Sequence, residues 1–493
     1  MAITVNGKEV YGSDASGNPA YTAFGENLVA MNYPFIQAAP VNGFLPANWR
    51  AYTDGSSGTA GVTGTEFSAT TGTGGLGSYG AVQSFRALNY KAGEGGMARF
   101  TARFPNGGVA SSWQGAGLLN IGDELSFGFN GTEFGIWHRH NGKPEVQTIQ
   151  VTGAASGSEN ATIFVDGTSY TVPLTSGTVQ HNAHEIAEYL DANATGWEST
   201  QNDDTAQLVA LSDGDKTGTF SFASSSATAT VAEVTAGVTK TSDFVAQTSW
   251  NVDTSSWIDH TKGNVFQITY QYLGYGAIYF WIENPETGLF TLVHKIKWAN
   301  ANNKPSLGNP SMHAGWYATS IGSTEDIQVF GASFNASSQG PQVKTRNPRA
   351  QDHENSNVGT TLENILSIRN KRVVNGLINQ QEIEPLSLSI SNESGSKAAT
   401  FELRSNPTFG AETNFQNTGN VNLISEYDTT SNTVTGGKLL DSFVVSGGSS
   451  ITLDLERYRL RVPPTLTLCV CAKANASGSG LTLNAAMNWY EDT

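Results

Sequence analysis

The fold of this chain is decided by the stretch Leu466-Thr-Leu-Cys-Val-Cys-Ala472, followed by Asn475-Ala-Ser-Gly-Ser-Gly480 and Leu481-Thr-Leu-Asn-Ala-Ala-Met-Asn-Trp489. Apolar residues occupy alternate positions on both sides of the Gly/Ser-rich turn, which is the period of a β-strand with one buried face. We therefore predict two strands that form a hairpin, and a β-sandwich that ends on this hairpin.

Cys469 and Cys471, the only two cysteines, lie within the first of these strands. Residues two apart in a strand share a face, and their parallel side chains are too far apart for an easy disulfide. We predict buried free thiols.

Composition extends the β prediction to the whole chain. With 493 residues the chain is too long for one core, so we expect two to four domains. Charged residues make up only 14% and there are 54 glycines, which disfavours long helices and favours short strands joined by turns.

Charge and hydropathy limit the partners. A net charge of −16 opposes binding to nucleic acid and to anionic lipid. No apolar run approaches the roughly 18 residues of a membrane span, and the start of the chain lacks the pattern of a signal peptide. We expect synthesis in the cytoplasm and no membrane insertion.

Changes in residue composition and in apolar periodicity along the chain predict five segments. These are an extended N-terminal arm (1–27), a discontinuous β-sandwich (28–147 and 242–335), an inserted α+β domain (148–241), a linker with a short helix or strand (336–384) and a C-terminal β-sandwich (385–493). Within the insertion, Asp166-Gly167 is typical of a two-residue hairpin turn, and the apolar spacing over 179–190 predicts a helix.

Two pairs of histidines are the metal-ligand candidates. His138-Arg139-His140 has a spacing that some zinc sites use, but without a third ligand a solvated strand end before the Asn141-Gly142 turn is the favoured interpretation. His181 and His184 lie one turn apart on the predicted helix, where a half-exposed flank is favoured. We assign no metal and no cofactor.

Paired carboxylates are the candidates for acid–base chemistry. Glycosidases need two carboxylates that face each other, whereas Asp123-Glu124 and Asp203-Asp204 are adjacent in sequence and are explained by turn polarity. We assign no catalytic residue and predict that the protein is not an enzyme.

Aromatic residues beside Gly/Asn-rich loops suggest a glycan-binding surface, since sugar rings stack on such side chains. The candidate contacts are Trp298, Trp316, Tyr317 and Tyr275. For Trp137 and Trp281 a place in a sandwich core is favoured.

Three segments carry a resemblance to a known class. They are Ser13-Asp-Ala-Ser-Gly-Asn-Pro-Ala-Tyr-Thr-Ala-Phe-Gly-Glu26, Lys262-Gly-Asn-Val-Phe-Gln-Ile-Thr-Tyr-Gln-Tyr-Leu-Gly-Tyr-Gly-Ala277, and the ending from Pro385-Leu-Ser-Leu-Ser-Ile-Ser to Asn488-Trp-Tyr-Glu-Asp492. Together they resemble structural virion proteins of tailed bacteriophages and other double-stranded DNA viruses. The first sandwich is similar to concanavalin-like or jelly-roll modules.

This resemblance implies a mainly β protein of the virion, with sandwich domains displayed outward, assembly as a homo-oligomer in which a trimer is favoured, and an N-terminal arm that docks on other virion proteins. Tyr11, Tyr21 and Phe24 are the candidate docking residues of the arm.

Three functions follow in order of preference. The first is a non-enzymatic structural protein of a fibre, tail or capsid surface that contacts other virion proteins. The second is a host-recognition module that binds surface polysaccharide. A polysaccharide-degrading tailspike is less favoured, because neither a facing carboxylate pair nor a β-helix repeat is found.

Overall fold

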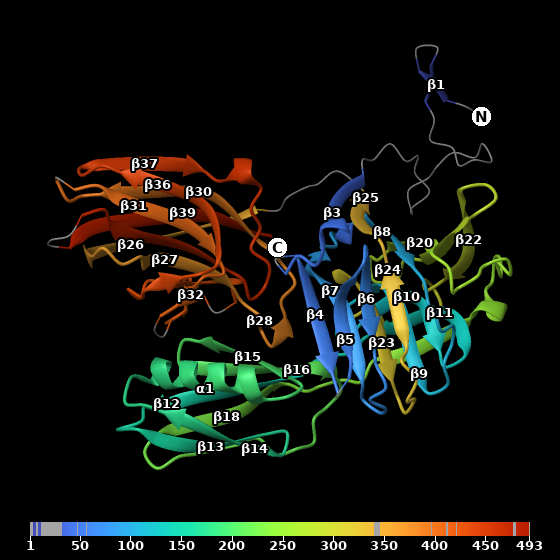
Figure 1. Cartoon of the computed structure of the whole chain (residues 1–493), viewed down its shortest axis with the longest axis horizontal. Helices are drawn as coiled ribbons and strands as arrows, with labels where there is room; N and C mark the ends of the chain where they lie inside the picture. Colours follow the sequence, from blue (N-terminus) through green and yellow to red (C-terminus); the bar gives the residue numbers. More distant parts are fainter. Residues whose placement is uncertain are drawn as a thin grey trace. The chain divides into compact units, whose positions relative to one another are not determined.

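The computed structural model describes residues 3–5, 8–10, 32–46, 48–55, 57–339, 346–395, 397–410, 413–420, 422–476 and 480–492. The predicted docking residues Tyr11, Tyr21 and Phe24 lie outside these ranges. The chain divides into two units, Met1–Lys143 with Val238–Val343, and Pro144–Gly237 with Lys344–Thr493. The strands of each unit form antiparallel ladders, and the protein is mainly β with β-sandwich domains (Figure 1).

The first unit is a sandwich of two large sheets. One sheet has the order β19 (Thr241–Ala246), β11 (Glu133–His140), β10 (Glu124–Asn130), β9 (Ser112–Leu119), β23 (Met312–Ser320), β7 (Tyr79–Leu88), β4 (Trp49–Asp54). The other has the order β22 (Leu289–Ile296), β21 (Ile278–Asn284), β20 (Asn264–Gln271), β8 (Gly95–Ala102), β25 (Phe334–Gln339), β3 (Asn32–Ala38). Smaller sheets are β24 (Gln328–Gly331), β6 (Glu66–Thr70), β5 (Thr59–Thr63), and the pair β1 (Ile3–Val5), β2 (Lys8–Val10).

Alternation along the strands places an aromatic core between these two sheets. On β20, Phe266, Ile268 and Tyr270 occupy alternate positions and are all fully buried. Phe266 meets Phe127 of the facing sheet with ring centroids 4.6 Å apart. The opposite side of β20 is partly covered, because Gln267 is buried and accepts a hydrogen bond of 2.5 Å from Arg99.

The segment inserted into the first unit is an α+β module of the second unit. Its sheets are β15 (Trp197–Asn202), β16 (Thr205–Asp213), β12 (Pro144–Gly153), β18 (Thr228–Thr235), and β14 (Thr168–Leu174), β13 (Glu159–Val165), β17 (Ser221–Ala223), with the helix α1 (Val179–Asn193). The predicted hairpin is confirmed: β13 pairs with β14, and Asp166 and Gly167 have φ of 47° and 78°. The predicted helix is also confirmed, and Thr178 caps it by accepting a hydrogen bond from the backbone N–H of His181.

The C-terminal part of the second unit is a further sandwich. One sheet has the order β26 (Arg346–Val358), β39 (Leu481–Asp492), β30 (Ile383–Asn392), β37 (Ser449–Asp454). The other has the order β33 (Gln416–Asn417), β34 (Ser425–Asp428), β27 (Glu363–Asn370), β38 (Thr467–Ala474), β31 (Ala399–Ser405), β36 (Lys438–Val445). Two short pairs are β28 (Val373–Val374) with β29 (Leu377–Ile378), and β32 (Thr408–Phe409) with β35 (Val434–Thr435).

Both strands of the predicted C-terminal hairpin are present, as β38 and β39, but the predicted pairing between them is wrong. β38 pairs with β27 and β31, whereas β39 pairs with β26 and β30 in the opposite sheet. Both strands turn an apolar side toward the same core, so alternation is identical whether the chain folds back in one sheet or crosses to the other. The prediction of buried free thiols at Cys469 and Cys471 is confirmed.

The predicted linker over 336–384 is also wrong for much of its length. β26 pairs with β39 along most of its residues. β27 is the strand that the prediction allowed as an alternative to a helix, and it lies inside the six-stranded sheet. β26 is an edge strand whose side chains from Asn347 to Asn357 are exposed or half-buried, so it carries little apolar alternation. It includes Pro348, which edge strands tolerate.

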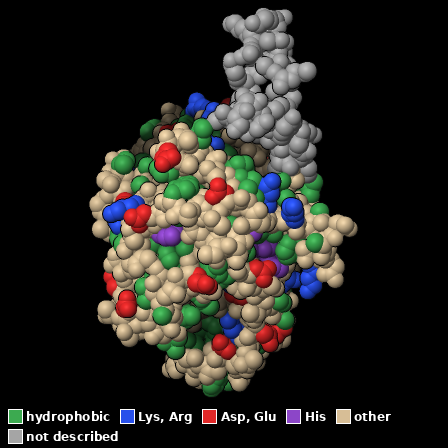
Figure 2. Space-filling view, turned by 90° about the vertical axis from the view of Figure 1, so that its right-hand side faces the viewer, with side chains coloured by type: hydrophobic (Ala, Val, Ile, Leu, Met, Phe, Trp, Pro, Cys, Tyr) green, Lys and Arg blue, Asp and Glu red, His purple; other side chains and the backbone are tan. Residues whose placement is uncertain are grey.

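Charge is dispersed on the face seen in Figure 2, where Lys and Arg are scattered among Asp, Glu and many uncharged side chains. Among the described residues, no helix has both the length and the apolar character to cross a membrane.

Candidate functional site

Strand β11 carries ionisable side chains on both of its sides. Phe134 and Ile136 point into the core, and His138 and His140 continue this side toward the end of the strand. Arg139 lies on the opposite side, the outer side of the seven-stranded sheet. The sequence His-Arg-His therefore contributes to two separate clusters.

The outer cluster is a buried ionic network around Arg139. Its Nη1 lies 2.9 Å from Oε2 of Glu124 and donates to the hydroxyl of Tyr317 at 3.1 Å. The Tyr317 hydroxyl donates to Oε1 of Glu124 at 2.8 Å, and Ser126 donates to the same oxygen. Burial raises the pKa of Tyr317 well above its usual value, so the hydroxyl remains a donor.

Aromatic rings and a glycine complete this outer cluster. The Arg139 guanidinium lies 3.9 Å from the ring centroid of Trp137 and 4.8 Å from that of Trp113. Gly115 provides space for Tyr317, because a Cβ at this glycine would lie 2.4 Å from an atom of the ring. Each charge in the cluster has an opposite charge or a ring against it, which suits a structural role.

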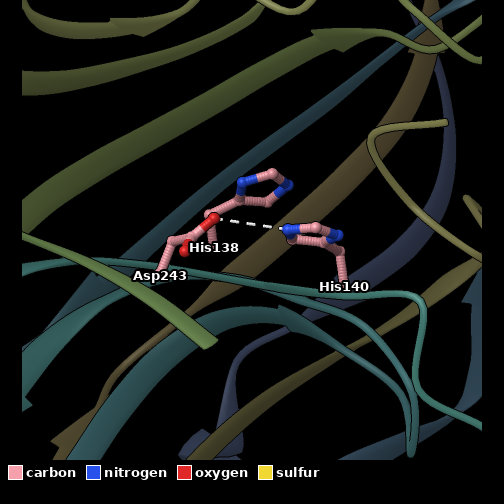
Figure 3. A group of neighbouring side chains, drawn as sticks. All are labelled: His138, His140 and Asp243. Atoms are coloured by element: carbon pink, nitrogen blue, oxygen red, sulfur yellow. Dashed lines mark hydrogen bonds and ion pairs between the residues drawn. The ribbon is translucent and has the colours of Figure 1, made fainter. Parts of the chain in front are cut away.

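The inner cluster consists of His138, His140 and Asp243 (Figure 3). Asp243 lies on β19 directly opposite His138 of β11, and its Oδ2 lies 3.3 Å from Nε2 of His140. The two imidazole rings stack with centroids 4.5 Å apart. One ligand atom from each of the three residues lies within 4.8 Å of the others.

Burial determines the protonation of His138. The ring is 2% exposed, and burial lowers its pKa to about 4 although the carbonyl of Ser306 acts in the opposite direction. His138 is therefore neutral at pH 7. The carboxylate of Asp243, in contrast, is on a side chain that is 53% exposed.

A loop holds this cluster in place. Trp298 packs edge-on against both imidazoles, with centroid distances of 5.2 Å to each ring, and its Nε1 donates to the carbonyl of Lys304 at 2.7 Å. Asp123 anchors the end of the loop, since it accepts hydrogen bonds from the backbone N–H of Gly308 at 2.6 Å and of Asn309 at 2.8 Å.

The predicted glycan-contact aromatics have different environments. Trp316 is fully buried in the core and donates to the carbonyl of Thr101 at 2.9 Å, so its prediction as a sugar contact is wrong. Tyr317 is 6% exposed within the Arg139 network, so its prediction is wrong as well. Both belong to β23, an interior strand of the sheet, although the sequence places them near Gly-rich turns.

Trp298 and Tyr275 remain at the surface. Trp298 is half-buried and Tyr275 is 39% exposed. Their loops are joined, because the backbone N–H of Ser306 donates to the carbonyl of Gly274 at 2.8 Å.

The histidine predictions have mixed outcomes. The favoured solvated strand end at His138 and His140 is wrong, because both rings are buried. His181 and His184 form a half-buried helix flank, as predicted, and lie 3.1 Å from Glu185 and 3.6 Å from Glu188.

Asp243 is the residue that the sequence analysis missed. It follows His140 by more than a hundred residues, but the two ends of an insertion must return to neighbouring positions in the host sheet. A polar residue at the start of the strand after the insertion was therefore the available signal.

No protein-family model and no curated protein matches this chain. Among solved structures, the chain is similar to an endo-β-1,4-glucuronan lyase from the fungus Trichoderma reesei, with 8% identity and a TM-score of 0.26 over 62% of this chain and 95% of that chain. It is also similar to lectin I-B4 from Griffonia simplicifolia in its metal-free form, with 9% identity and a TM-score of 0.22 over 60% of this chain and 94% of that chain. These likenesses carry no argument about function.

Proposed function

We propose that this chain is a non-enzymatic structural protein of a virion, a subunit of a fibre, tail or capsid surface that binds neighbouring subunits and is displayed outward. The single observation that carries the proposal is the interleaved path of the chain. It crosses between its two units after Lys143, after Gly237 and after Val343.

This path suits a subunit that must persist outside a cell. Because three crossings join the units, cleavage at any one of them leaves a covalent connection. The resemblance of three segments to structural virion proteins points in the same direction.

Contacts inside the second unit hold the inserted module to the C-terminal sandwich. Arg369 pairs with Glu426 at 2.5 Å and also donates to the carbonyl of Gln201 in the module. Arg372 pairs with Glu198 of the module at 2.9 Å. A small apolar cluster joins the same two parts; its members are Val146, Val209, Val373 and Ile378.

Association with neighbours would use strand edges. β4, β22 and β37 end their sheets within the described part of the chain, and a neighbouring strand can add to such an edge through main-chain hydrogen bonds. We expect a homo-oligomer, with a trimer favoured, and the N-terminal arm as the segment that docks on other virion proteins.

The test is to detect the chain in purified particles of the virus that encodes it. Mass spectrometry of gradient-purified virions and labelling with an antibody against the second unit should both detect it. Its absence from intact particles that contain the other structural proteins would overturn the proposal. Light scattering of the recombinant chain, with and without residues 1–27, then measures the oligomeric state.

A second candidate, binding of host surface polysaccharide, is favoured by the joined loops that carry Tyr275 and Trp298. We expect Tyr275→Ala to reduce binding to isolated host polysaccharide at least tenfold. Tyr458→Ala is the matched control, because Tyr458 is 37% exposed and lies in the other unit. Equal binding by both variants and the unaltered chain would exclude this surface.

A further inference from the structure

We propose that His138, His140 and Asp243 bind a divalent transition metal ion of the zinc type. This inference goes beyond the proposed structural function and does not depend on it. It starts from the arrangement of the ligands: a His-x-His pair on one strand and a carboxylate directly opposite on the neighbouring antiparallel strand. Two imidazoles and one carboxylate, with a further position for water, are an established ligand set for zinc.

The imidazoles select the kind of metal. Nitrogen ligands suit zinc, copper, nickel and iron, whereas calcium and magnesium prefer sites made of oxygen atoms.

The distances between the ligand atoms require a small adjustment when zinc binds. At zinc–ligand distances of about 2.0–2.2 Å, tetrahedral ligand atoms lie roughly 3.3 Å apart. His140 and Asp243 already have this separation, 3.3 Å, and the atom of His138 lies within 4.8 Å of the other two.

The surroundings of His138 prepare it as a ligand. Its Nε2 lies 2.8 Å from the carbonyl oxygen of Ser306. A carbonyl only accepts hydrogen bonds, so Nε2 carries a proton and Nδ1 is the nitrogen that remains to bind a metal. Metal-binding histidines commonly donate their second nitrogen to a backbone carbonyl in this manner.

His140 changes its tautomer when a metal binds. In the structure its Nδ1 accepts from the amide of Asn141 at 2.8 Å, so Nε2 carries the proton toward Asp243. For Nε2 to bind the metal, this proton moves to Nδ1, and the Asn141 side chain turns so that its oxygen accepts it. This turn breaks the hydrogen bond of 3.0 Å that the Asn141 amide donates to the carbonyl of Pro305. The number of protons is unchanged. Asn141 is thus a positioning residue for the metal site.

A metal ion between β11 and β19 would have a structural role. β11 is the last strand before the inserted module and β19 is the first strand after it. An ion bound between His138, His140 and Asp243 would connect the two strands at the point where the chain leaves and re-enters the first unit. Trp298 packs edge-on against both imidazoles and therefore lies beside the proposed ion.

A second cluster of possible ligands provides the internal control. Glu145, Asp215 and Glu233 of the second unit also bring ligand atoms within 4.8 Å of one another. Glu145 is already engaged, since it accepts hydrogen bonds from Gln147 at 2.7 Å and from the backbone N–H of Lys216 at 2.6 Å. This cluster contains oxygen ligands alone and carries no proposal.

The experiment is titration of the full, tag-free and chelator-treated chain with zinc chloride, followed by calorimetry, and with cobalt chloride, followed by visible absorption. We expect one ion per chain, tetrahedral cobalt bands, and a higher Tm with zinc. His140→Gln and Asp243→Asn should each weaken zinc binding at least tenfold. Asp215→Asn and His294→Gln, which remove an acid of the second cluster and a different buried histidine, should leave it unchanged.

Three results would overturn the proposal: no zinc binding below about 100 µM, zinc binding by both His140→Gln and Asp243→Asn at the affinity of the unaltered chain, or loss of binding in Asp215→Asn. Asp243→Asn keeps the test valid if the histidine variant does not fold, because the Asp243 side chain is 53% exposed.

Asn141→Asp gives an independent check of the metal site. A carboxylate that accepts from Nδ1 of His140 should tighten zinc binding about tenfold or more, and weaker binding would contradict the role of Asn141.

Discussion

The two sides of strand β11 differ in how completely their charges are satisfied. On the outer side, Arg139 and Glu124 are 6% and 5% exposed and are joined to Tyr317 and Ser126 in a buried network of paired charges, in which Nη2 of Arg139 has no hydrogen-bond partner. On the inner side, two buried imidazoles face the half-exposed carboxylate of Asp243. A buried network in which opposite charges are paired stabilises one arrangement of the sheet, whereas a cluster with a solvent-exposed carboxylate can accept a ligand.

The largest expected effect is the loss of the outer ion pair. Glu124→Gln leaves the buried Arg139 without its opposite charge, which should reduce the free energy of unfolding by about 3–5 kcal/mol. Urea unfolding followed by tryptophan fluorescence measures it. Glu66→Gln is the control, because the Glu66–Arg103 pair has side chains 28% and 30% exposed. There we expect at most about 1 kcal/mol, and equal losses in both variants would remove the distinction.

The packing of the outer side gives the next effect. Gly115→Ala places a methyl group against the ring of Tyr317, and overpacking of this kind costs about 1–3 kcal/mol. Gly263→Ala should change the free energy of unfolding by less than about 0.5 kcal/mol, because a Cβ at Gly263 meets no atom within 4 Å. If Gly115→Ala leaves the free energy of unfolding unchanged, Tyr317 moves freely, which contradicts its fixed place in the buried network.

On the core side of β11, we expect the free energy of unfolding to depend on pH. His260 packs on Phe134 of β11 with centroids 4.0 Å apart, and burial lowers its pKa to about 4, below the usual value of 6.5. The unfolded chain then binds this proton first as the pH falls. The stabilisation is complete above about pH 6.5 and is lost as the pH falls toward 4.

His260 is only partly buried, so we discount the effect for solvent screening to about 1 kcal/mol. The free energy of unfolding, measured between pH 7 and pH 4 for the unaltered chain and for His260→Phe, checks it. If both have the same pH dependence, His260 is not the titrating group.

The smallest expected effect is on the inner ion pair. In the metal-free chain, Asp243→Asn should change the free energy of unfolding by no more than about 0.5 kcal/mol, because this carboxylate is largely solvated. Urea unfolding in the presence of a chelator measures it. A loss as large as that of Glu124→Gln would show that the two sides of β11 do not differ as the structure indicates.

Much of the local structure could be predicted from the sequence. The alternating apolar residues of β20, β38 and β39, the turn at Asp166-Gly167 and the helix at α1 follow from side-chain periodicity and from backbone preferences, which act over a few residues. The predicted aromatics were less reliable. Trp316 and Tyr317 are neighbours in sequence and point to opposite sides of one strand, and both are buried.

The candidate site could be predicted only in part. The spacing of His138 and His140 indicated a shared side of a strand, but neither their burial nor Asp243 followed from it. Burial depends on the loop that carries Trp298, and the third ligand depends on the register of β19 against β11.

The sequence by itself determined that this is a mainly β protein, where many of its strands lie, and that its cysteines are buried and free. Only the tertiary structure decided that β38 and β39 belong to opposite sheets, that polar β26 is an edge strand, and that Asp243 lies beside His138 and His140. The physical reason is that periodicity specifies which side of a strand is buried, whereas strand partners are chosen by packing between segments far apart in the chain.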